Sequence, residues 1–216
     1  MGIHQYIQGF TELENIYRAP GHFQYQHHSV AAHSFKVAEI AQILGDIEEV
    51  EGKNTVNWQS LYEKSLNHDY TERFIGDIKT PVKYATKQLR QMLADVDDNM
   101  TENFIDSEIP EEFKDRYRRR LGEGKDDTLE GRILAIADKV DLLYEAFGEI
   151  EKGNPDTTFM EIFSESLKTL TRFKDMVSSR YFIKHVLPDL LNEDFASREK
   201  LTELSAKILS DVDEAR

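Results

Sequence analysis

Apolar residues recur along this chain at intervals of three and four, which is the spacing of one face of an α-helix. After Ser29 the stripe consists of Val30, His33, Val37, Ile40 and Leu44. His33 therefore lies on the buried side of a predicted helix, and Gly45 is expected to end that helix. Sustained alternation of apolar and polar residues is scarce, and so are the dipeptides typical of tight turns. The pattern predicts an all-α protein.

Two further helices are predicted before residue 100. Residues 58–66 carry an apolar stripe that leads directly to His68 and Asp69. The pair Thr80-Pro81 is expected to begin the next helix, because Thr suits an N-cap and Pro suits the first helical position. The apolar stripe of that helix is Val82, Ala85, Leu89, Met92 and Val96. The acidic segment 95–112 is expected to form a loop or a short exposed helix.

The second half of the chain contains the most apolar helix. Asp127, with Glu130 three residues later, is a carboxylate version of a capping box and is expected to begin it. Apolar residues then occupy almost every side, at Leu129, Ile133, Leu134, Ile136, Val140, Leu142, Leu143 and Phe147, with Asp138 among them. Residues 157–173 and 197–215 are predicted to be helical too, after breaks at 122–126 and 153–156. Residues 1–216 are expected to form one all-α domain, a bundle of six or more helices.

The charge of the chain argues against several classes of function. Its 41 acidic and 27 basic residues give a net charge of −14. Proteins that bind nucleic-acid polymers gather Lys and Arg into a patch, whereas the dense basic stretch here, 114–120, lies between acidic residues and is typical of a solvated helix face. No apolar run approaches the roughly 20 residues that span a bilayer, the N-terminus lacks a signal-peptide layout, and cysteine is absent. We expect a cytoplasmic protein that binds a small molecule, with neither a nucleic-acid polymer nor a membrane as its partner.

Two histidines and two aspartates are the candidate chemistry. His33, His68, Asp69 and Asp138 each lie near the buried side of a predicted helix. Taken singly, each has a structural explanation: a hydrogen-bonded core histidine, the cap of a helix, or an ion pair of Asp138 with Arg132 or Lys139. Taken together they favour a divalent cation, because an isolated buried carboxylate would otherwise neutralise. The remaining five histidines, His4, His22, His27, His28 and His185, show no such pattern.

The order of these residues resembles a known motif. The pattern His33, His68-Asp69 and Asp138 is similar to that of the HD (His-Asp) domain superfamily of metal-dependent phosphohydrolases. One branch is closer, the bacterial 5′-deoxynucleotidases, which hydrolyse deoxyribonucleoside 5′-monophosphates. The segments that carry this likeness are Arg18, Val30-Ala31-Ala32-His33-Ser34, His68-Asp69-Tyr70-Thr71-Glu72, Gly76-Asp77-Ile78-Lys79-Thr80-Pro81-Val82-Lys83-Tyr84 and Ala137-Asp138-Lys139. The likeness covers roughly residues 10–190, which would leave a helical C-terminal extension.

The resemblance implies a role for each matching residue. His33, His68, Asp69 and Asp138 would bind one divalent ion, which could be cobalt, manganese, zinc, magnesium or nickel. Arg18 would bind phosphate oxygens, and Glu72 would protonate the departing 5′-oxygen. Asp77, Ile78, Lys79 and Thr80 would line the nucleoside pocket, and Asp69 and Asp138 would also lie against the substrate. The resemblance further implies a homodimer.

Two positions depart from the branch. Ala32 stands where Glu is usual before the first His, which removes a possible supporting acceptor. Ala19 stands where Trp commonly follows the Arg, so the preference for deoxyribose over ribose is open, and Tyr17 is an alternative source of an aromatic ring. The leading hypothesis is a metal-dependent nucleoside 5′-monophosphate phosphohydrolase. The alternatives are an HD-type pyrophosphohydrolase of a signalling nucleotide and a regulatory module that binds nucleotides with weak or no turnover.

Overall fold

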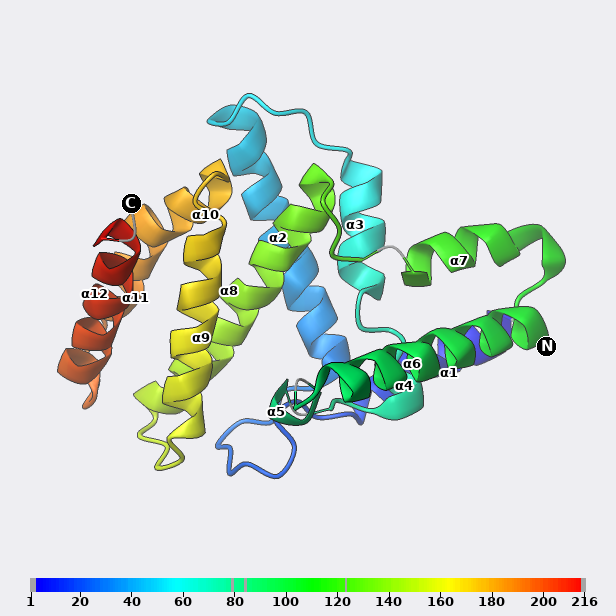
Figure 1. The fold of residues 1–216 in the computed structure, drawn as a ribbon, viewed down its shortest axis with the longest axis horizontal. Helices are drawn as coiled ribbons and strands as arrows, with labels where there is room; N and C mark the ends of the chain where they lie inside the picture. The colour runs from blue at the N-terminus through cyan, green and yellow to red at the C-terminus, as the bar shows by residue number, and fades with distance from the viewer. Residues whose placement is uncertain (1–2, 79, 84, 123, 215–216) are drawn as a thin grey trace.

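Helix α8 (Leu129–Glu151) runs through the middle of the computed structural model, which describes residues 3–78, 80–83, 85–122 and 124–214 (Figure 1). Three helices pack around it, namely α2 (Val30–Val50), α3 (Trp58–Asn67) and α9 (Thr158–Arg172). Most of its side chains are consequently buried, as its apolar sequence predicts. The main hydrophobic core between these helices includes Val37, Leu44, Leu61, Ile133, Leu143, Phe163 and Leu170.

The C-terminal helices extend the same core. A short α10 (Val177–Tyr181), a single π-helical turn η2 (Phe182–Val186) and α11 (Leu187–Leu191) lead to α12 (Arg198–Glu214). Helix α12 packs against α9, and its residues Leu201 and Ile208 belong to the main core. The predicted helices at 157–173 and 197–215 are thus confirmed to within a few residues.

A second, smaller core lies beside the end of α3. It joins α1 (Ile3–Glu14), α4 (Glu72–Ile75) and α6 (Lys87–Glu108), with η1 (Glu111–Phe113) and α7 (Lys114–Gly122) following. Tyr70 is at its centre: its ring stacks on that of Tyr6 at 4.5 Å, and its hydroxyl donates to the Tyr6 carbonyl. Because Tyr70 directly follows Asp69, this packing holds the chain in place just after α3.

The predicted end of α2 at Gly45 is wrong, since the helix continues to Val50. Gly45 serves close packing instead. A Cβ atom on it would lie 2.8 Å from the indole of Trp58 and 3.2 Å from Leu61, both on α3. The bare backbone lets the two helices approach, which is why a residue that usually ends helices is found inside one.

The cap predicted at Asp127 is wrong by one residue. Thr128 is the N-cap of α8, and its hydroxyl accepts a hydrogen bond from the Gly131 N–H. The Asp126 carboxylate accepts from the Thr128 N–H and thereby sets this position. Glu130 does not complete a capping box, because its carboxylate accepts from the Asn57 N–H at the start of α3.

The region after residue 79 also differs from the prediction. Thr80 lies inside a single turn, α5 (Thr80–Lys83), and the long helix α6 begins only at Lys87, with Thr86 as its cap. The acidic segment 95–112, predicted to be a loop or a short exposed helix, instead belongs to the long helix α6 up to Glu108. Most of its acidic residues are exposed, Asp97 is half-buried against Thr71, and the burial of Phe104 and Ile105 in the second core stabilises the helix.

The described residues contain no β-strand; Tyr17 and Ser29 form an isolated bridge in the loop before α2. The helices of that part of the chain exceed the six expected, so the all-α class is confirmed. No helix described is both long enough and apolar enough to cross a membrane.

Two glycine substitutions test the packing role of Gly45. At a solvent-exposed position inside a helix, replacing Gly with Ala raises the free energy of unfolding by about 0.5–1 kcal/mol. We expect Gly45→Ala to lower the free energy of unfolding instead, by about 1–3 kcal/mol, because the methyl group collides with Trp58. Gly148→Ala in α8 is the control, since nothing lies within 4 Å of its added Cβ, and it should stabilise the protein. Urea unfolding of both variants measures the difference, and a stabilised Gly45→Ala variant would contradict the packing role.

Candidate metal centre

The four predicted side chains meet where α2, α8 and the end of α3 lie together. His33 comes from α2, Asp138 from α8, and His68 and Asp69 from the turn that directly follows α3. The Nε2 atom of His33 lies 3.2 Å from Nε2 of His68, 3.3 Å from an Asp69 oxygen and 3.3 Å from an Asp138 oxygen. His68 Nε2 is also 3.3 Å from the same Asp69 oxygen. Three segments far apart in the sequence thus place two nitrogens and two oxygens at one point.

The outer nitrogens of the two imidazole rings determine what the inner ones present. His68 Nδ1 lies 2.8 Å from the Ser65 carbonyl, which can only accept, so Nδ1 carries the proton. His33 Nδ1 likewise donates to the Asp141 carboxylate at 2.6 Å. In their neutral forms both rings therefore direct an Nε2 lone pair inward. Two lone pairs and two carboxylate oxygens then face one another, an arrangement that requires a cation.

The spacing of the donor atoms fits a divalent metal. Bonds from such ions to nitrogen and oxygen are about 2.0–2.2 Å, which puts neighbouring donors about 2.8–3.1 Å apart in octahedral geometry and about 3.3–3.6 Å apart in tetrahedral geometry. The observed separations of 3.2–3.3 Å lie between these two ranges. His33, His68 and Asp138 could hold a metal on this geometry, and Asp69 supplies a fourth oxygen at the same point.

The pKa values of Asp138 and His33 also indicate that positive charge is stabilised at this centre. Burial raises the pKa of Asp138, but Lys125 and His33 outweigh it, so the pKa lies well below its usual value. Burial and Arg18 would lower the pKa of His33, yet its hydrogen bonds with Asp138, Asp141 and Asp69 raise it to about 10. A proton on His33 and a metal ion would therefore compete for the same position.

A ring of alternating charges surrounds the centre. In order, it consists of His33, Asp141, Lys36, Glu145, Arg18 and Asp69, with successive contacts of 2.6, 2.9, 3.1, 3.2 and 3.5 Å and a closing contact of 3.3 Å from Asp69 to His33. Arg18 is 13% exposed, so it does not point into solvent as an isolated loop arginine would. The ring connects the candidate metal donors to Arg18 through the buried carboxylates of Asp141 and Glu145 and the half-buried Lys36, which fixes the orientation of both.

Three members of this ring were missed from the sequence, namely Lys36, Asp141 and Glu145. Asp138, Asp141 and Glu145 follow one another at i, i+3 and i+7, which places three acidic groups on one face of α8. This spacing was the available signal. The acceptor for His33 Nδ1 is Asp141. Ala32 is exposed, and the absence of a Glu at this position therefore does not leave the His33 ring without an acceptor.

A lysine that sequence analysis did not single out also reaches the centre. Lys125, from the loop before α8, donates to the second Asp138 oxygen at 2.7 Å. The sequence allowed an ion pair of Asp138 with Arg132 or Lys139. Lys139 lies 3.1 Å from that same oxygen, whereas Arg132 pairs with Asp175. Asp138 thus turns one oxygen toward His33 and the other toward two ammonium groups.

Glu72 begins α4, one turn beyond Asp69. One of its carboxyl oxygens is buried and has no hydrogen-bond partner among the described residues. Arg73 binds Glu12, so it does not neutralise Glu72. Burial, followed by the negative charges of Asp69 and Asp77, raises the pKa of Glu72 to about 8. A carboxyl group of this kind carries a proton at neutral pH and can donate it.

The segment after α4 lies against the loop that carries Arg18. The Ala19 N–H donates to Asp77 at 3.1 Å, and the Gln24 amide donates to the carbonyls of Arg18 and Ala19. Ile78 is half-buried. Lys79 and the side chain of Thr80 lie outside the described residues. The Tyr17 ring packs on His27.

The chain is similar in sequence and in fold to several known proteins. A sequence model described as 5′-deoxynucleotidase YfbR-like matches residues 5–190. A 5′-deoxynucleotidase of Pasteurella multocida is 25% identical over 182 residues, covering 84% of this chain and 87% of its own. One from Erwinia tasmaniensis is 26% identical, covering 88% of this chain and 95% of its own. A crystal structure of an HD-domain phosphohydrolase from Listeria innocua is 59% identical, with a TM-score of 0.91, and covers 98% of this chain and all of that one.

Two substitutions separate a metal donor from its support. Asp69→Ala removes an oxygen of the centre and should abolish measurable Mn²⁺ binding. Asp141→Ala leaves all four donors but removes the acceptor of His33 Nδ1, so we expect Mn²⁺ affinity to fall by about 10–100-fold. Calorimetric titration with Mn²⁺, with folding checked by circular dichroism, measures both. Native Mn²⁺ affinity in the folded Asp69→Ala protein would exclude Asp69 from the metal site.

Proposed function

The chain belongs to the YfbR-like 5′-deoxynucleotidase family of HD-domain hydrolases, and from this premise we propose that it hydrolyses deoxyribonucleoside 5′-monophosphates to nucleoside and inorganic phosphate. The observation that carries the proposal is the convergence of two imidazole nitrogens and two carboxylate oxygens beside a largely buried arginine. A cation among these donors and a guanidinium next to them suit a phosphate dianion in a chain whose net charge is −14.

His33, His68, Asp69 and Asp138 would hold one divalent cation, which would polarise the phosphoryl group and lower the pKa of water. Arg18 binds phosphate oxygens; its guanidinium is held by Glu145 on one side and lies 3.5 Å from Asp69 on the other. In the reaction the oxygen of water bonds to phosphorus and the bond to the 5′-oxygen breaks. Glu72 protonates that oxygen, and a proton from the water restores Glu72.

The nucleoside would lie along the segment Asp77, Ile78, Lys79 and Thr80. The hydrogen bond from the Ala19 N–H to Asp77 supports this assignment, because it joins that segment to the one that carries Arg18. Phosphate and nucleoside would then be bound by two segments that this hydrogen bond joins. Asp69 and Asp138 would contact the phosphate from the opposite side.

The identity of the metal is also part of the proposal. Two nitrogen and two oxygen donors suit cobalt, manganese, zinc, nickel or magnesium, and affinities for such sites generally rise from manganese to copper, so supply decides as much as the donors do. A homodimer and a cytoplasmic location stay predictions. Size-exclusion chromatography with light scattering tests the first.

Phosphate release from a panel of nucleotides tests the function. The panel contains deoxyribonucleoside and ribonucleoside 5′-monophosphates, the 3′-monophosphates, and a pyrophosphate-bearing nucleotide, each with Mn²⁺ or Co²⁺ and with a chelator. We expect release from 5′-monophosphates only, and none with the chelator. Release of pyrophosphate would indicate the alternative HD chemistry, and binding without turnover would indicate a regulatory module.

Glu72→Gln tests the proton donor. The amide keeps the size of the side chain but cannot supply the proton, so kcat should fall by about 10²–10⁴-fold while Mn²⁺ affinity is retained. Glu63→Gln is the matched control, because Glu63 pairs with Arg120 on the surface of α3 and should leave kcat unchanged. Steady-state kinetics and Mn²⁺ titration provide the two readouts. Joint loss of metal and activity would make Glu72 a metal ligand instead.

Ala19 tests how the sugar is recognised. Its methyl group replaces a large ring common in the family branch, so a steric barrier against the 2′-hydroxyl is reduced. We expect weaker discrimination between dAMP and AMP than in Trp-bearing relatives, and Ala19→Trp should sharpen it by roughly 10–200-fold in kcat/KM. Ala19→Gly is the control: it relaxes a backbone with φ of 51° without adding a ring and should leave the ratio unchanged. Strong rejection of AMP by the native protein would point to Asp77 or Tyr17 instead.

A further inference from the structure

We propose that Lys125 binds the phosphate group of the substrate from the side opposite Arg18, as a cation presented by the loop between α7 and α8. The proposal rests on the proposed function. It adds a second phosphate-binding residue, supplied by a segment that none of the motifs includes.

The first argument is the position of the ammonium group. Its nitrogen lies 2.7 Å from one Asp138 oxygen, while the other oxygen of that carboxylate faces His33. The Lys125 side chain is 41% exposed, and no other partner of it is seen in the described part of the chain. An ammonium group has three donors, and Asp138 uses one. The remaining donors are available to an anion that enters the centre.

The second argument is the balance of charge. The Lys125 ammonium contacts Asp138 at 2.7 Å, and the Arg18 guanidinium lies 3.5 Å from Asp69. The two cations thus flank the donor set, one beside each carboxylate, and a phosphate dianion between them would be held from two sides.

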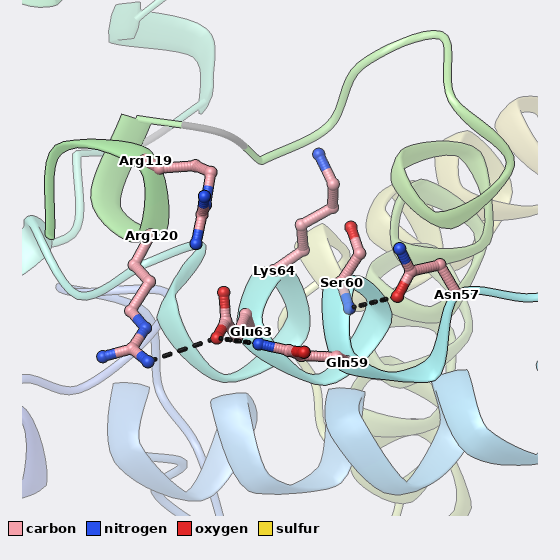
Figure 2. A pocket seen from close by; sticks show the side chains of 7 residues that line it. All are labelled: Asn57, Gln59, Ser60, Glu63, Lys64, Arg119 and Arg120. Carbon is pink, nitrogen blue, oxygen red and sulfur yellow. Dashed lines mark hydrogen bonds and ion pairs between the residues drawn. The ribbon is translucent and has the colours of Figure 1, made fainter. Parts of the chain in front are cut away.

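The third argument is the way in which the loop is built. Lys64 of α3 is only 5% exposed, and its ammonium binds the Asp126 carboxylate at 2.6 Å and the Gly124 carbonyl at 3.4 Å. Figure 2 shows this side chain extending from α3 toward the loop, at the edge of a pocket of about 340 Å³ that Arg119 and Arg120 also line. Lys64 thereby fixes the residues on both sides of Lys125.

The first turn of α8 also packs against the loop, at Gly131. A Cβ atom on Gly131 would lie 2.0 Å from an Asp126 oxygen and 2.6 Å from the Asp126 nitrogen. Only glycine permits the loop to rest on this first turn of the helix. The loop is therefore held by α3, which precedes His68 and Asp69, and by α8, which carries Asp138. This support places Lys125 beside Asp138.

Two lysine variants test the proposal, because Lys139 contacts the same Asp138 oxygen from the helix. With the Mn²⁺-loaded full chain, we would measure KM and kcat for dAMP, the calorimetric Kd of inorganic phosphate, and the Kd of Mn²⁺. Lys125→Met should raise KM and the phosphate Kd by about 10–100-fold, with the Mn²⁺ Kd changed less than threefold. Lys139→Met should change each value less than threefold, and Lys125→Arg should recover part of the loss.

A third variant examines the support of the loop. Lys64→Met should raise the phosphate Kd by a smaller factor, and it should have no effect in a protein that already carries Lys125→Met, because Lys64 acts through Lys125. Additive effects of the two substitutions would overturn the positioning role of Lys64.

The proposal is overturned if Lys125→Met binds inorganic phosphate as the native protein does, or if it behaves like Lys139→Met. A change in Mn²⁺ affinity alone also overturns it, because Lys125 then only balances the charge of Asp138. Failure of the proposed function looks different: the native protein would release phosphate from no nucleotide, while phosphate binding that still depends on Lys125 would support this site.

Discussion

The structure is organised around one electrostatic constraint: the inner nitrogens of His33 and His68 and the carboxylates of Asp69 and Asp138 occupy the same small volume. Such a group is stable in a buried place only with positive charge at its centre, since desolvated carboxylates are costly when unpaired. A proton on His33 or a divalent cation meets this requirement. The surrounding cations, Lys36, Lys125, Lys139 and Arg18, also stabilise the negative charge of these carboxylates and of Asp141.

Helix α8 links the centre to the charged residues around it. Asp138, Asp141 and Glu145 share one face of this helix, and they contact respectively the centre, the outer nitrogen of His33, and Arg18. Asp141 and Glu145 belong to a closed ring of charges, so each has a positively charged partner on both sides. Removing one member leaves buried charges unpaired, which makes the effects of single substitutions non-additive. Arg18 and the candidate metal donors are therefore best regarded as one unit.

Glycines and the second core provide the geometry that the charges need. Gly45 lets α2 and α3 approach, and α2 carries His33 while α3 leads to His68. Tyr70, buried among aromatic rings, holds the chain directly after Asp69. Gly131 lets the loop that carries Lys125 rest on α8. In each case packing outside the centre decides where a polar side chain inside it points.

Local helical periodicity predicted the helical class and most helix positions, and the buried helix faces together with the HD motif predicted the four residues that meet at the centre. Gly45 and the acidic part of α6 were mispredicted because packing partners distant in the sequence override a local preference. The cap predicted at Asp127 is displaced by one residue because the neighbouring Asp126 carboxylate accepts from the Thr128 N–H. Only the tertiary structure revealed that Asp141 supports His33 and that Lys125 reaches Asp138. The spacing of Asp141 from Asp138 places both on one helix face, but the contacts of Asp141 with His33 and of Lys125 with Asp138 exist only once helices and loops are assembled.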